Sequence, residues 1–343
     1  MALTTALFKS CKTLLVIMCT FYSKTILGMA NQIQRRTKQL SVVEPSTLFR
    51  KIISKIKNDW DEIELANNWN SVTWAQKRLL VNHEYRFIYC AIPKNASSSL
   101  MKAIVRIGNS KRKEKLLNSS RDTIRNYVEL NYSLASYTYA EANKIINSDY
   151  FKFVIVRNPW ARLVSTYLNL FVRFHEHGRP TDLVRDSVKY ISGEDLKDRD
   201  LINITFEQLI DYLCATEDRY LDQHCIPQYL FLGGVNNYFL ARMENLSKDL
   251  QYIEKNLNLS LELPNLNKTE YSYSSNGQQN FEKISASDIR NWKTTLPDYK
   301  QFYTPELIYL VSQRYAQDIE MFGYKFAEYD KYTSNYLTIG NSK

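Results

Sequence analysis

The chain has 343 residues, of which 44% are hydrophobic and 13% aromatic, so it can bury a sizeable core in one large domain. Its formal net charge is +9 and its pI about 9.1, which favours an anionic partner such as a nucleotide, an acidic polysaccharide or a membrane surface. No dense basic block with interleaved aromatic residues is present, so we expect no nucleic-acid partner.

Residues 1–30 have the pattern of a targeting segment. Lys9 and Lys12 precede the apolar run TLLVIMCTFY, which is shorter than the ~20 residues of a comfortable membrane span. Small Gly28 and Ala30 fit a cleaved signal peptide. The flanking lysines fit a signal-anchor with its amino terminus in the cytosol. Either interpretation predicts the secretory route, with or without a membrane attachment through this segment.

The rest of the chain divides into a stem, one domain and a tail. Residues 31–80 are polar and basic and predict a stem with an outer helix, residues 81–330 the compact domain, and residues 331–343 a tail. Hydrophobic patterns predict strands at 86–92, 152–157 and from 237. They predict helices at 99–108, 160–174, 205–214 and 246–257, and further helices within 304–324. Residues 110–148 are predicted to be mostly helical, with Ser120 or Asp122 as a cap. Alternating strands and helices predict an α/β fold whose mostly parallel sheet is covered on both faces.

The first strand leads into an unusual loop. Its apolar run ends at Pro93, Lys94 follows, and the hydroxyl residues Ser97–Ser99 precede a helical pattern. An ordinary strand-to-helix turn would explain the proline and the serines. The same arrangement also aims free backbone N–H groups and the positive end of a helix dipole at one point. It therefore predicts a phosphate cradle with the Lys94 charge at its mouth.

The second strand repeats this arrangement in VIVRNPWARLVSTY. Arg157 stands at the strand end, and a loop bend would bring Ser165 near it. Arginine suits forked contacts with phosphate oxygens, each worth roughly 1.5–3 kcal/mol as a charge-assisted bond. Two such loops predict a ligand with two separated phosphate groups. The order GxxxxGK[ST] is absent, which disfavours a nucleotide kinase.

Several motifs together resemble the Golgi carbohydrate sulfotransferases, specifically the group that contains the chondroitin and dermatan 4-O-sulfotransferases (sulfotransferase family 2). CAIPKNASSSL and RNPWARLVSTY match the two family signatures, and ITFEQLIDYL, DQHCIPQY, ARMENLSKDL, LPNLNKT and YAQDIEMFGY follow in the family order. The resemblance covers about residues 85–326. It implies a P-loop-like α/β fold in a single sulfotransferase domain, with 3′-phosphoadenosine 5′-phosphosulfate as the donor.

The same resemblance assigns the donor-binding residues. The 5′-phosphosulfate is expected at Pro93, Lys94, Asn95, Ala96, Ser97, Ser98 and Ser99, and the 3′-phosphate at Arg157 and Ser165, with Arg162 of the same motif in the donor-binding set. Cys225 stands where the family usually has Trp, and FLGGVNNY replaces a cysteine-containing segment, so the acceptor side departs more from the family than the donor side. Ala96 stands where many sulfotransferases have Gly.

Sulfuryl transfer resembles phosphoryl transfer, in which positioning and charge neutralisation supply most of the catalysis. Lys94 is expected to stabilise charge on the departing oxygen, and no metal is needed. The acceptor hydroxyl requires a general base. Among four histidines, His83, His175 and His177 lack a motif, whereas His224 lies in the family-like DQHCIPQ and is the expected base. Asp222 and Glu244 are the alternatives, with Glu244 more suited to orienting the nucleotide-side loops.

The cysteines and the glycosylation motifs leave the compartment open. Beyond the targeting segment, Cys90, Cys214 and Cys225 either remain thiols or form a Cys214–Cys225 bridge, and no metal-ligand spacing is present. Asn-x-Ser/Thr motifs occur at Asn118, Asn131, Asn203, Asn245, Asn258 and Asn267. A further one at Asn95 lies in the first loop, and we expect it to be unused.

The acceptor is the least determined partner. The resemblance implies an anionic or neutral glycan, on a glycosaminoglycan or a glycoprotein, modified by a lumenal domain at the Golgi membrane (type II) or by a secreted enzyme. A basic run, namely Arg106, Lys111, Arg112, Lys113 and Lys115, either holds an acidic sugar chain or is a solvated helix end. The alternative function is a non-catalytic carbohydrate-binding protein that retains the fold.

Overall fold

The computed structural model describes residues 78–173, 180–193, 195, 203–233, 235–263, 280–291, 296–326 and 335–337. The chain forms two compact units, Met1–Trp69 and Asn70–Lys343, and all described residues belong to the second unit. The targeting segment, the stem up to residue 77, and the candidate bases His175 and His177 lie outside the described residues.

A five-stranded sheet forms the centre of the described part. Its strands follow the order of the chain: β1 (Leu79–Asn82), β2 (Phe87–Cys90), β3 (Phe151–Val156), β4 (Tyr238–Arg242) and β5 (Asn335–Leu337). The central strands β2, β3 and β4 are parallel, and the two edge strands pair antiparallel with their neighbours. The sheet is therefore mostly parallel, and the predicted α/β fold is confirmed.

Alternate side chains of the central strands enter two separate hydrophobic cores, because successive strand residues point to opposite faces. Ile88 and Val154 pack in one core, whereas Tyr89 and Phe153 pack in the other. Parallel strands covered on both faces have continuous apolar sequences, as FIYC and the FVIV part of β3 do here.

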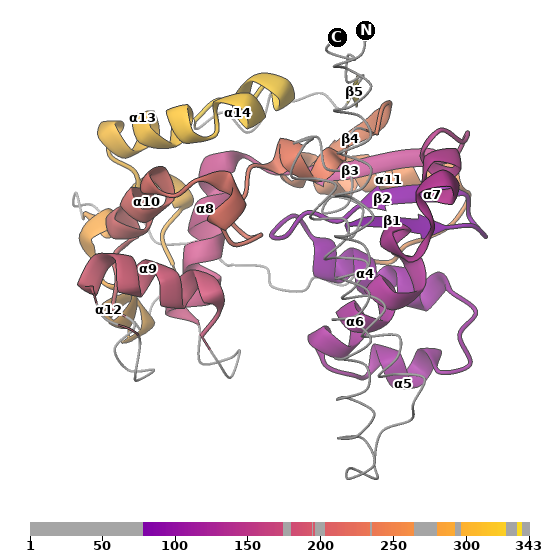
Figure 1. Ribbon diagram of the computed structural model, residues 1–343, viewed down its shortest axis with the longest axis horizontal. Helices are drawn as coiled ribbons and strands as arrows, with labels where there is room; N and C mark the ends of the chain where they lie inside the picture. The colour runs from indigo at the N-terminus through magenta and orange to yellow at the C-terminus, as the bar shows by residue number, and fades with distance from the viewer. Residues whose placement is uncertain are drawn as a thin grey trace, which may run out of the picture. The chain divides into compact units, whose positions relative to one another are not determined.

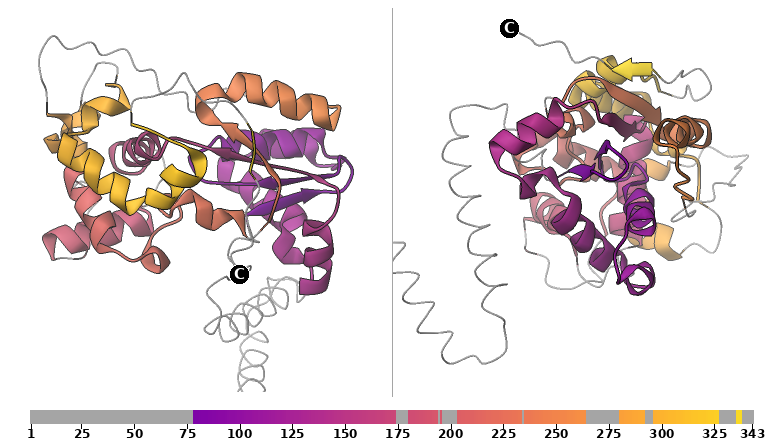
Figure 2. Two further views of the ribbon diagram at one scale, coloured as in Figure 1. Left: turned by 90° about the horizontal axis from the view of Figure 1, so that it is seen from above. Right: turned by 90° about the vertical axis from the view of Figure 1, so that its right-hand side faces the viewer.

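Different sets of helices cover the two faces of the sheet. The core that contains Tyr89 is covered by α4 (Ser97–Ile107), α5 (Lys113–Leu117), α6 (Arg121–Tyr132) and α11 (Leu246–Leu257). In Figure 2, α11 lies beside α4 on this face. The other core is built with α7 (Tyr139–Ile146), α8 (Pro159–Tyr167), α9 (Asp182–Ser192), α10 (Phe206–Ala215), α12 (Ala286–Asn291), α13 (Pro305–Arg314) and α14 (Ala316–Phe322), most of which gather beside the carboxyl ends of the parallel strands (Figure 1).

Short helical turns connect these elements. The 3₁₀ turns are η1 (Leu134–Ser136), η5 (Asp218–Tyr220), η6 (Gln228–Leu232), η7 (Met243–Asn245), η8 (Phe281–Lys283) and η9 (Tyr299–Phe302). The predicted helix at 160–174 ends as an α-helix at Tyr167 and continues as the π-helix η2 (Leu168–Val172). Arg290 donates hydrogen bonds to the carbonyls of Phe171 and Val172, which satisfies the end of this helix.

Several helix starts follow the expected capping chemistry. Ser120 caps α6 by accepting from the Thr123 amide, as predicted, and Thr205 with Gln208 forms a capping box at α10. Among the described strands and α-helices, β1, β5, α9 and α12 were not predicted. β1 begins at Leu79, before the expected domain start at 81, and β5 lies in the expected tail.

The described ranges contain neither a membrane-spanning helix nor a disulfide. No helix there is long and apolar enough to cross a membrane. The three cysteines in these ranges are free thiols, with Cys90 and Cys225 buried, so the alternative of a Cys214–Cys225 bridge is not formed.

Candidate functional site

The candidate site lies at the carboxyl ends of β2 and β3, where the two predicted loops leave the sheet side by side. The last paired residues of β2 and β3 are Cys90 and Val154, and the chain enters a loop on each strand shortly afterwards. In open α/β sheets, ligands bind at this edge, where adjacent strands send their helices away. The fold therefore brings the two predicted anion-binding loops together.

The first loop presents an uncapped helix start. Lys94 and Ala96 adopt left-handed backbone conformations, with φ values of 71° and 56°. Ala96 is the N-cap of α4 and offers no side-chain hydrogen bond, and no described group accepts from the amides of Ser97–Ser99. Left-handed residues followed by free amides form a concave anion-binding nest. The backbone here matches the predicted phosphate cradle.

Asn95 occupies this loop differently from the other predicted donor-binding residues. Its side chain is 0% exposed and donates from Nδ2 to the carbonyl of Ile155 at 2.9 Å and to Oε1 of Gln228 at 2.7 Å. The side chain thus ties the loop to β3 and does not face a ligand. A buried, doubly bonded amide also fits the prediction that the Asn95 glycosylation motif is unused.

The second loop is built differently from the first. Asn158 caps α8 by accepting from the amides of Trp160 and Ala161, and Pro159 has no N–H, so this helix start holds no open cradle. An anion bound here depends on side chains. Arg157 is partly exposed and donates from Nη1 to the Lys94 carbonyl at 3.2 Å, which brings the two loops into contact.

Ser165 lies on α8, which is continuous from Pro159 to Tyr167. The bend expected between Arg157 and Ser165 is the strand-to-helix turn at Asn158. No contact joins the two side chains, so their joint role in holding a phosphate stays a prediction.

Arg162 acts as a structural clamp in this structure. It is 1% exposed and donates to the carbonyls of Pro93 (3.3 Å), Ile226 (2.7 Å) and Gln223 (3.2 Å). Because its donors are used by the backbone, the geometry favours a positioning role over the donor contact predicted from the sequence. The clamp fastens the first loop to residues 222–228, here called the 222–228 segment.

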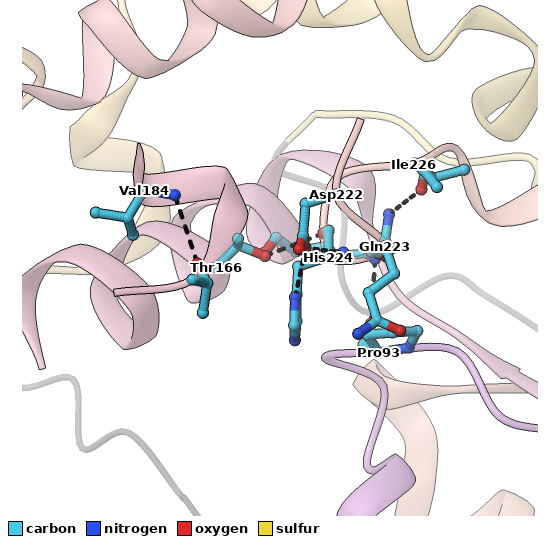
Figure 3. Close-up of polar contacts among 9 residues, drawn as sticks. Pro93, Thr166, Val184, Asp222, Gln223, His224 and Ile226 are labelled. Atoms are coloured by element: carbon cyan, nitrogen blue, oxygen red, sulfur yellow. Dashed lines mark hydrogen bonds and ion pairs between the residues drawn. The ribbon is translucent and has the colours of Figure 1, made fainter. Parts of the chain in front are cut away.

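The 222–228 segment holds the expected base. Asp222 Oδ1 contacts Nδ1 of His224 at 2.6 Å and also accepts from the His224 amide at 2.8 Å, while Thr166 donates to the His224 carbonyl. Figure 3 shows the imidazole extending from Asp222 on the side of the segment where Pro93 lies. No described group bonds Nε2, and the side chain is 20% exposed.

Burial and charge set the protonation state of this pair. Burial lowers the pKa of His224 below its ordinary value, against the opposing effect of Asp222. Burial raises the pKa of Asp222, but the hydrogen bond and charge of His224 outweigh it and leave that pKa below its ordinary value. Near neutral pH the pair is therefore a carboxylate and a neutral ring. A carboxylate can only accept, so Nδ1 carries the proton and Nε2 keeps its lone pair.

Lys94 experiences a strongly cationic environment. Burial, and after it the charges of Arg157, Arg121, Arg162 and Arg173, together lower its pKa to about 7. Lys94 also contributes to lowering the pKa of His224, so the two side chains lie within electrostatic range. Arg121 and Arg173 were not predicted as site residues, because only the tertiary structure brings α6 and the end of η2 towards the first loop.

Two further residues that the sequence did not single out support the loops. Gln228, the residue after Pro227 in the DQHCIPQ motif, bonds to Asn95, to both backbone groups of Arg157 and to Asp318. Asp318 is 0% exposed and accepts from the amides of Gln228 and Tyr229 at 2.8 Å each. The proline–glutamine pair was the sequence signal that could have identified Gln228, whereas no motif marked Asp318.

Glu244 occupies the orienting position expected of it. Its Oε1 accepts from the Asn158 amide at 2.8 Å, and its Oε2 accepts from the Tyr324 hydroxyl at 3.0 Å. The carboxylate therefore fixes the turn that follows Arg157. With both oxygens occupied in this way, Glu244 is less suited than His224 to act as a base.

Two other residues that the sequence suggested, His83 as a base and Arg106 as a glycan contact, form hydrogen bonds away from the two loops. The ring nitrogens of His83 bond to the hydroxyls of Tyr150 and Tyr137 beyond β1, at 2.8 and 2.7 Å. Arg106 bonds to the carbonyls of Leu261 and Glu262, so the first residue of the basic run joins α4 to the segment after α11. Within the described ranges no group of histidine, cysteine and carboxylate side chains could hold a metal ion.

Comparisons with known proteins agree with this geometry. Carbohydrate sulfotransferase 14 of Danio rerio is 25% identical over 265 residues, which are 72% of this chain and 62% of that protein. Carbohydrate sulfotransferase 11 of Rattus norvegicus is 26% identical over 229 residues, 61% of this chain and 62% of that protein. Carbohydrate sulfotransferase 10 of Xenopus laevis is 25% identical over 270 residues, 72% of this chain and 67% of that protein.

The chain thus spans about 62% of the length of the first two relatives. No solved structure matches it. The model of the sulfotransferase family matches residues 77–325, which include both strand-end loops and the 222–228 segment. This chain belongs to the sulfotransferase family.

Proposed function

We propose that this protein transfers a sulfuryl group from 3′-phosphoadenosine 5′-phosphosulfate to a sugar hydroxyl of a glycosaminoglycan or glycoprotein glycan. The observation that carries the proposal is the open start of α4, with Lys94 and Arg157 joined at its mouth. An uncapped helix start and several cationic side chains gathered around Lys94 fit a polyanionic ligand.

The two phosphate groups of the donor are assigned to different loops, because the loops differ in their chemistry. The amides and hydroxyls of Ser97–Ser99, with Lys94, would hold the 5′-phosphosulfate, and Arg157 with Ser165 would hold the 3′-phosphate. Asn95 and Arg162 would support this cradle from behind, because their side chains are bonded to protein carbonyls. Charge develops on the oxygen between sulfur and the departing phosphate, where Lys94 would stabilise it.

His224 is assigned the role of the general base that accepts the proton of the acceptor hydroxyl. Asp222 would hold the ring so that Nε2, which has no described partner, could accept the proton of the attacking hydroxyl. This role follows the logic of an oriented imidazole base, in which a carboxylate fixes the tautomer.

The class of the acceptor and the cellular location are proposed by similarity to the relatives. We propose a glycan acceptor, as those names indicate, within or near the chondroitin and dermatan 4-O-sulfotransferase group. We further propose that the domain works in the Golgi lumen behind an N-terminal signal-anchor, with secretion after cleavage as the alternative.

Labelled sulfate transfer tests the proposal directly. The protein should transfer label from the donor to at least one member of a panel of desulfated glycosaminoglycans and N-glycans. Lys94→Ala should abolish the transfer. Binding of a panel glycan without any transfer, in a protein that binds the donor, would contradict the proposal and support a non-catalytic carbohydrate-binding protein.

A further inference from the structure

Gln228 continues the sheet beyond the point where its strands separate. The ladder between β2 and β3 ends at the pair Cys90 and Val154. Beyond it, Oε1 of Gln228 accepts from the Arg157 amide at 2.9 Å, and Nε2 donates to the Arg157 carbonyl at 2.8 Å. One side-chain amide thus exchanges both hydrogen bonds with one backbone residue, as a neighbouring antiparallel strand does.

The same amide also reaches the first loop. Oε1 of Gln228 accepts from Nδ2 of Asn95 at 2.7 Å, and that Nδ2 donates to the Ile155 carbonyl as well. Asn95 and Gln228 are both 0% exposed. A buried bridge therefore runs from the first loop, through Asn95 and Gln228, to the backbone of Arg157.

Gln228 is also anchored outside the two loops. Its backbone amide donates to Oδ2 of Asp318 on α14 at 2.8 Å, and the neighbouring Tyr229 amide donates to Oδ1. Since Asp318 belongs to the carboxyl-terminal helices, the bridge has a fixed third point. This anchor adds to the direct bonds between the loops, from Arg157 to the Lys94 carbonyl and from Asn95 to the Ile155 carbonyl, in setting the positions of Asn95 and Arg157.

We infer that Gln228 is a positioning residue that sets the spacing between the two donor-phosphate sites, and so the preference for a nucleotide phosphorylated at both the 3′ and 5′ positions. The inference rests on the proposed function, in which the two loops hold those two phosphates. A second contact on the same ligand adds affinity only when the distance between the sites matches the ligand. A misplacement of about 1 Å can cost on the order of 10²-fold.

The test compares two nucleotides in one protein. Affinities for 3′-phosphoadenosine 5′-phosphate and for adenosine 5′-monophosphate are measured by calorimetry, and their ratio is the bisphosphate preference. Gln228→Met keeps the length of the side chain and removes its hydrogen bonds. We expect the preference to fall about 10- to 100-fold, the factor for losing one charge-assisted phosphate contact. Affinity for the monophosphate should stay within about threefold of the unmodified protein.

Asn95→Ala provides a second route if Gln228→Met does not fold. It removes the bonds of Asn95 to Gln228 and to the Ile155 carbonyl but leaves the Gln228–Arg157 pair in place, so the preference should fall by a smaller factor, about 3- to 10-fold. Tyr315→Phe is the matched control. It removes a buried hydrogen bond to the Cys225 carbonyl, on the same segment as Gln228 but away from both loops, and should leave the preference unchanged.

Three outcomes would overturn the inference. Equal losses of affinity for both nucleotides in Gln228→Met and Asn95→Ala would show a merely structural role. An unchanged preference in these variants would remove the role of Gln228 while leaving the proposed function intact. An unmodified protein without any preference for the bisphosphate would instead remove the donor assignment, and the inference with it.

Discussion

Lys94 combines a left-handed backbone conformation, partial burial and a surrounding group of arginines. A charge placed where the leaving group develops its own charge acts mainly in the transition state. In the proposed function, Lys94 therefore supplies the positive charge that stabilises the departing phosphate in the transition state.

Lys94→Ala should lower kcat far more than donor affinity. By analogy with the loss of one oxyanion-hole donor, we expect a decrease of about 10²–10³-fold in kcat. Steady-state kinetics with a saturating acceptor measures this effect, with Lys102→Ala on the same helix α4 as the control. If kcat changes only a few-fold while KM rises, Lys94 is a binding residue without a special role in the transition state.

Donor binding at pH 8 should take up protons. The pKa of Lys94 is lowered to about 7 in the protein without ligand, so the amine is mostly neutral at pH 8, and an adjacent phosphate favours its charged form. Calorimetry with 3′-phosphoadenosine 5′-phosphate in buffers of different ionisation enthalpy measures the uptake, which Lys94→Ala should abolish. Identical enthalpies in all buffers would refute this linkage.

The same lowered pKa has a defined effect on stability. The folded-state pKa of about 7 lies below the ordinary value of 10.5, so between these values the unfolded chain holds more protons on Lys94 than the folded protein does. The contribution of Lys94 to the free energy of unfolding therefore rises with pH across this window, and its full penalty is present below about pH 7.

His224→Ala should leave nucleotide affinity intact, lower kcat and flatten the acidic limb of the pH–rate profile. The limb is expected because protonation of Nε2 removes the base. Asp222→Asn is the companion variant: it keeps the ring but removes the carboxylate that selects the tautomer. A His224→Ala profile that retains the acidic limb and most of the rate would make His224 structural, and the base would then be sought at Asp222, Glu244 or another histidine.

At the scale of elements, the starts of α4 and α8 differ in what they offer to the proposed donor. The α4 start is open and strained, with Ala96 in the left-handed region and no capping side chain. The α8 start is closed by Asn158, which Glu244 holds through its amide. The open start suits a backbone cradle, and the closed start suits rigid presentation of the Arg157 side chain.

Ala96→Gly should stabilise the protein. A left-handed conformation costs an L-residue roughly 1–2 kcal/mol, part of which is offset by the greater entropy of glycine in the unfolded chain. We therefore expect the free energy of unfolding to rise by up to about 1 kcal/mol. Ala103→Gly, in the buried interior of the same helix, is the control and should destabilise by about 1 kcal/mol. Denaturant titration measures both, and a destabilised Ala96→Gly would contradict the strain argument.

At the scale of the whole molecule, the chain should enter the secretory pathway through residues 1–30 and carry N-glycans. Asn118 and Asn258 are exposed on the described surface, so their motifs are accessible, whereas Asn95 is buried. Expression in animal cells followed by glycosidase treatment should produce a mobility shift that Asn118→Gln and Asn258→Gln reduce. A cytosolic protein without any shift would refute the proposal and point to a soluble relative that acts on small molecules.

Local patterns predicted those parts of the fold that depend on short stretches of chain. The apolar runs around Phe87–Cys90 and Phe151–Val156 predicted the two strands that carry the loops, and Ser120 is the cap among the two predicted alternatives, Ser120 and Asp122. β5 could not be predicted, because a three-residue strand is defined by its pairing with β4 and has no pattern of its own.

The sequence by itself determined the family, the α/β class and the places of the two strand-end loops, because each depends on residues close together in the chain. Only the tertiary structure decided how the loops are held. Gln228 meets Arg157 across 71 positions and Asn95 across 133, and Asp318 meets Gln228 across 90. Such bonds form between groups that are distant in sequence and buried together, so no local spacing predicts them. The same physical reason moved Arg162 from an expected ligand contact to a buried clamp, since its position in the core decides which acceptors it can reach.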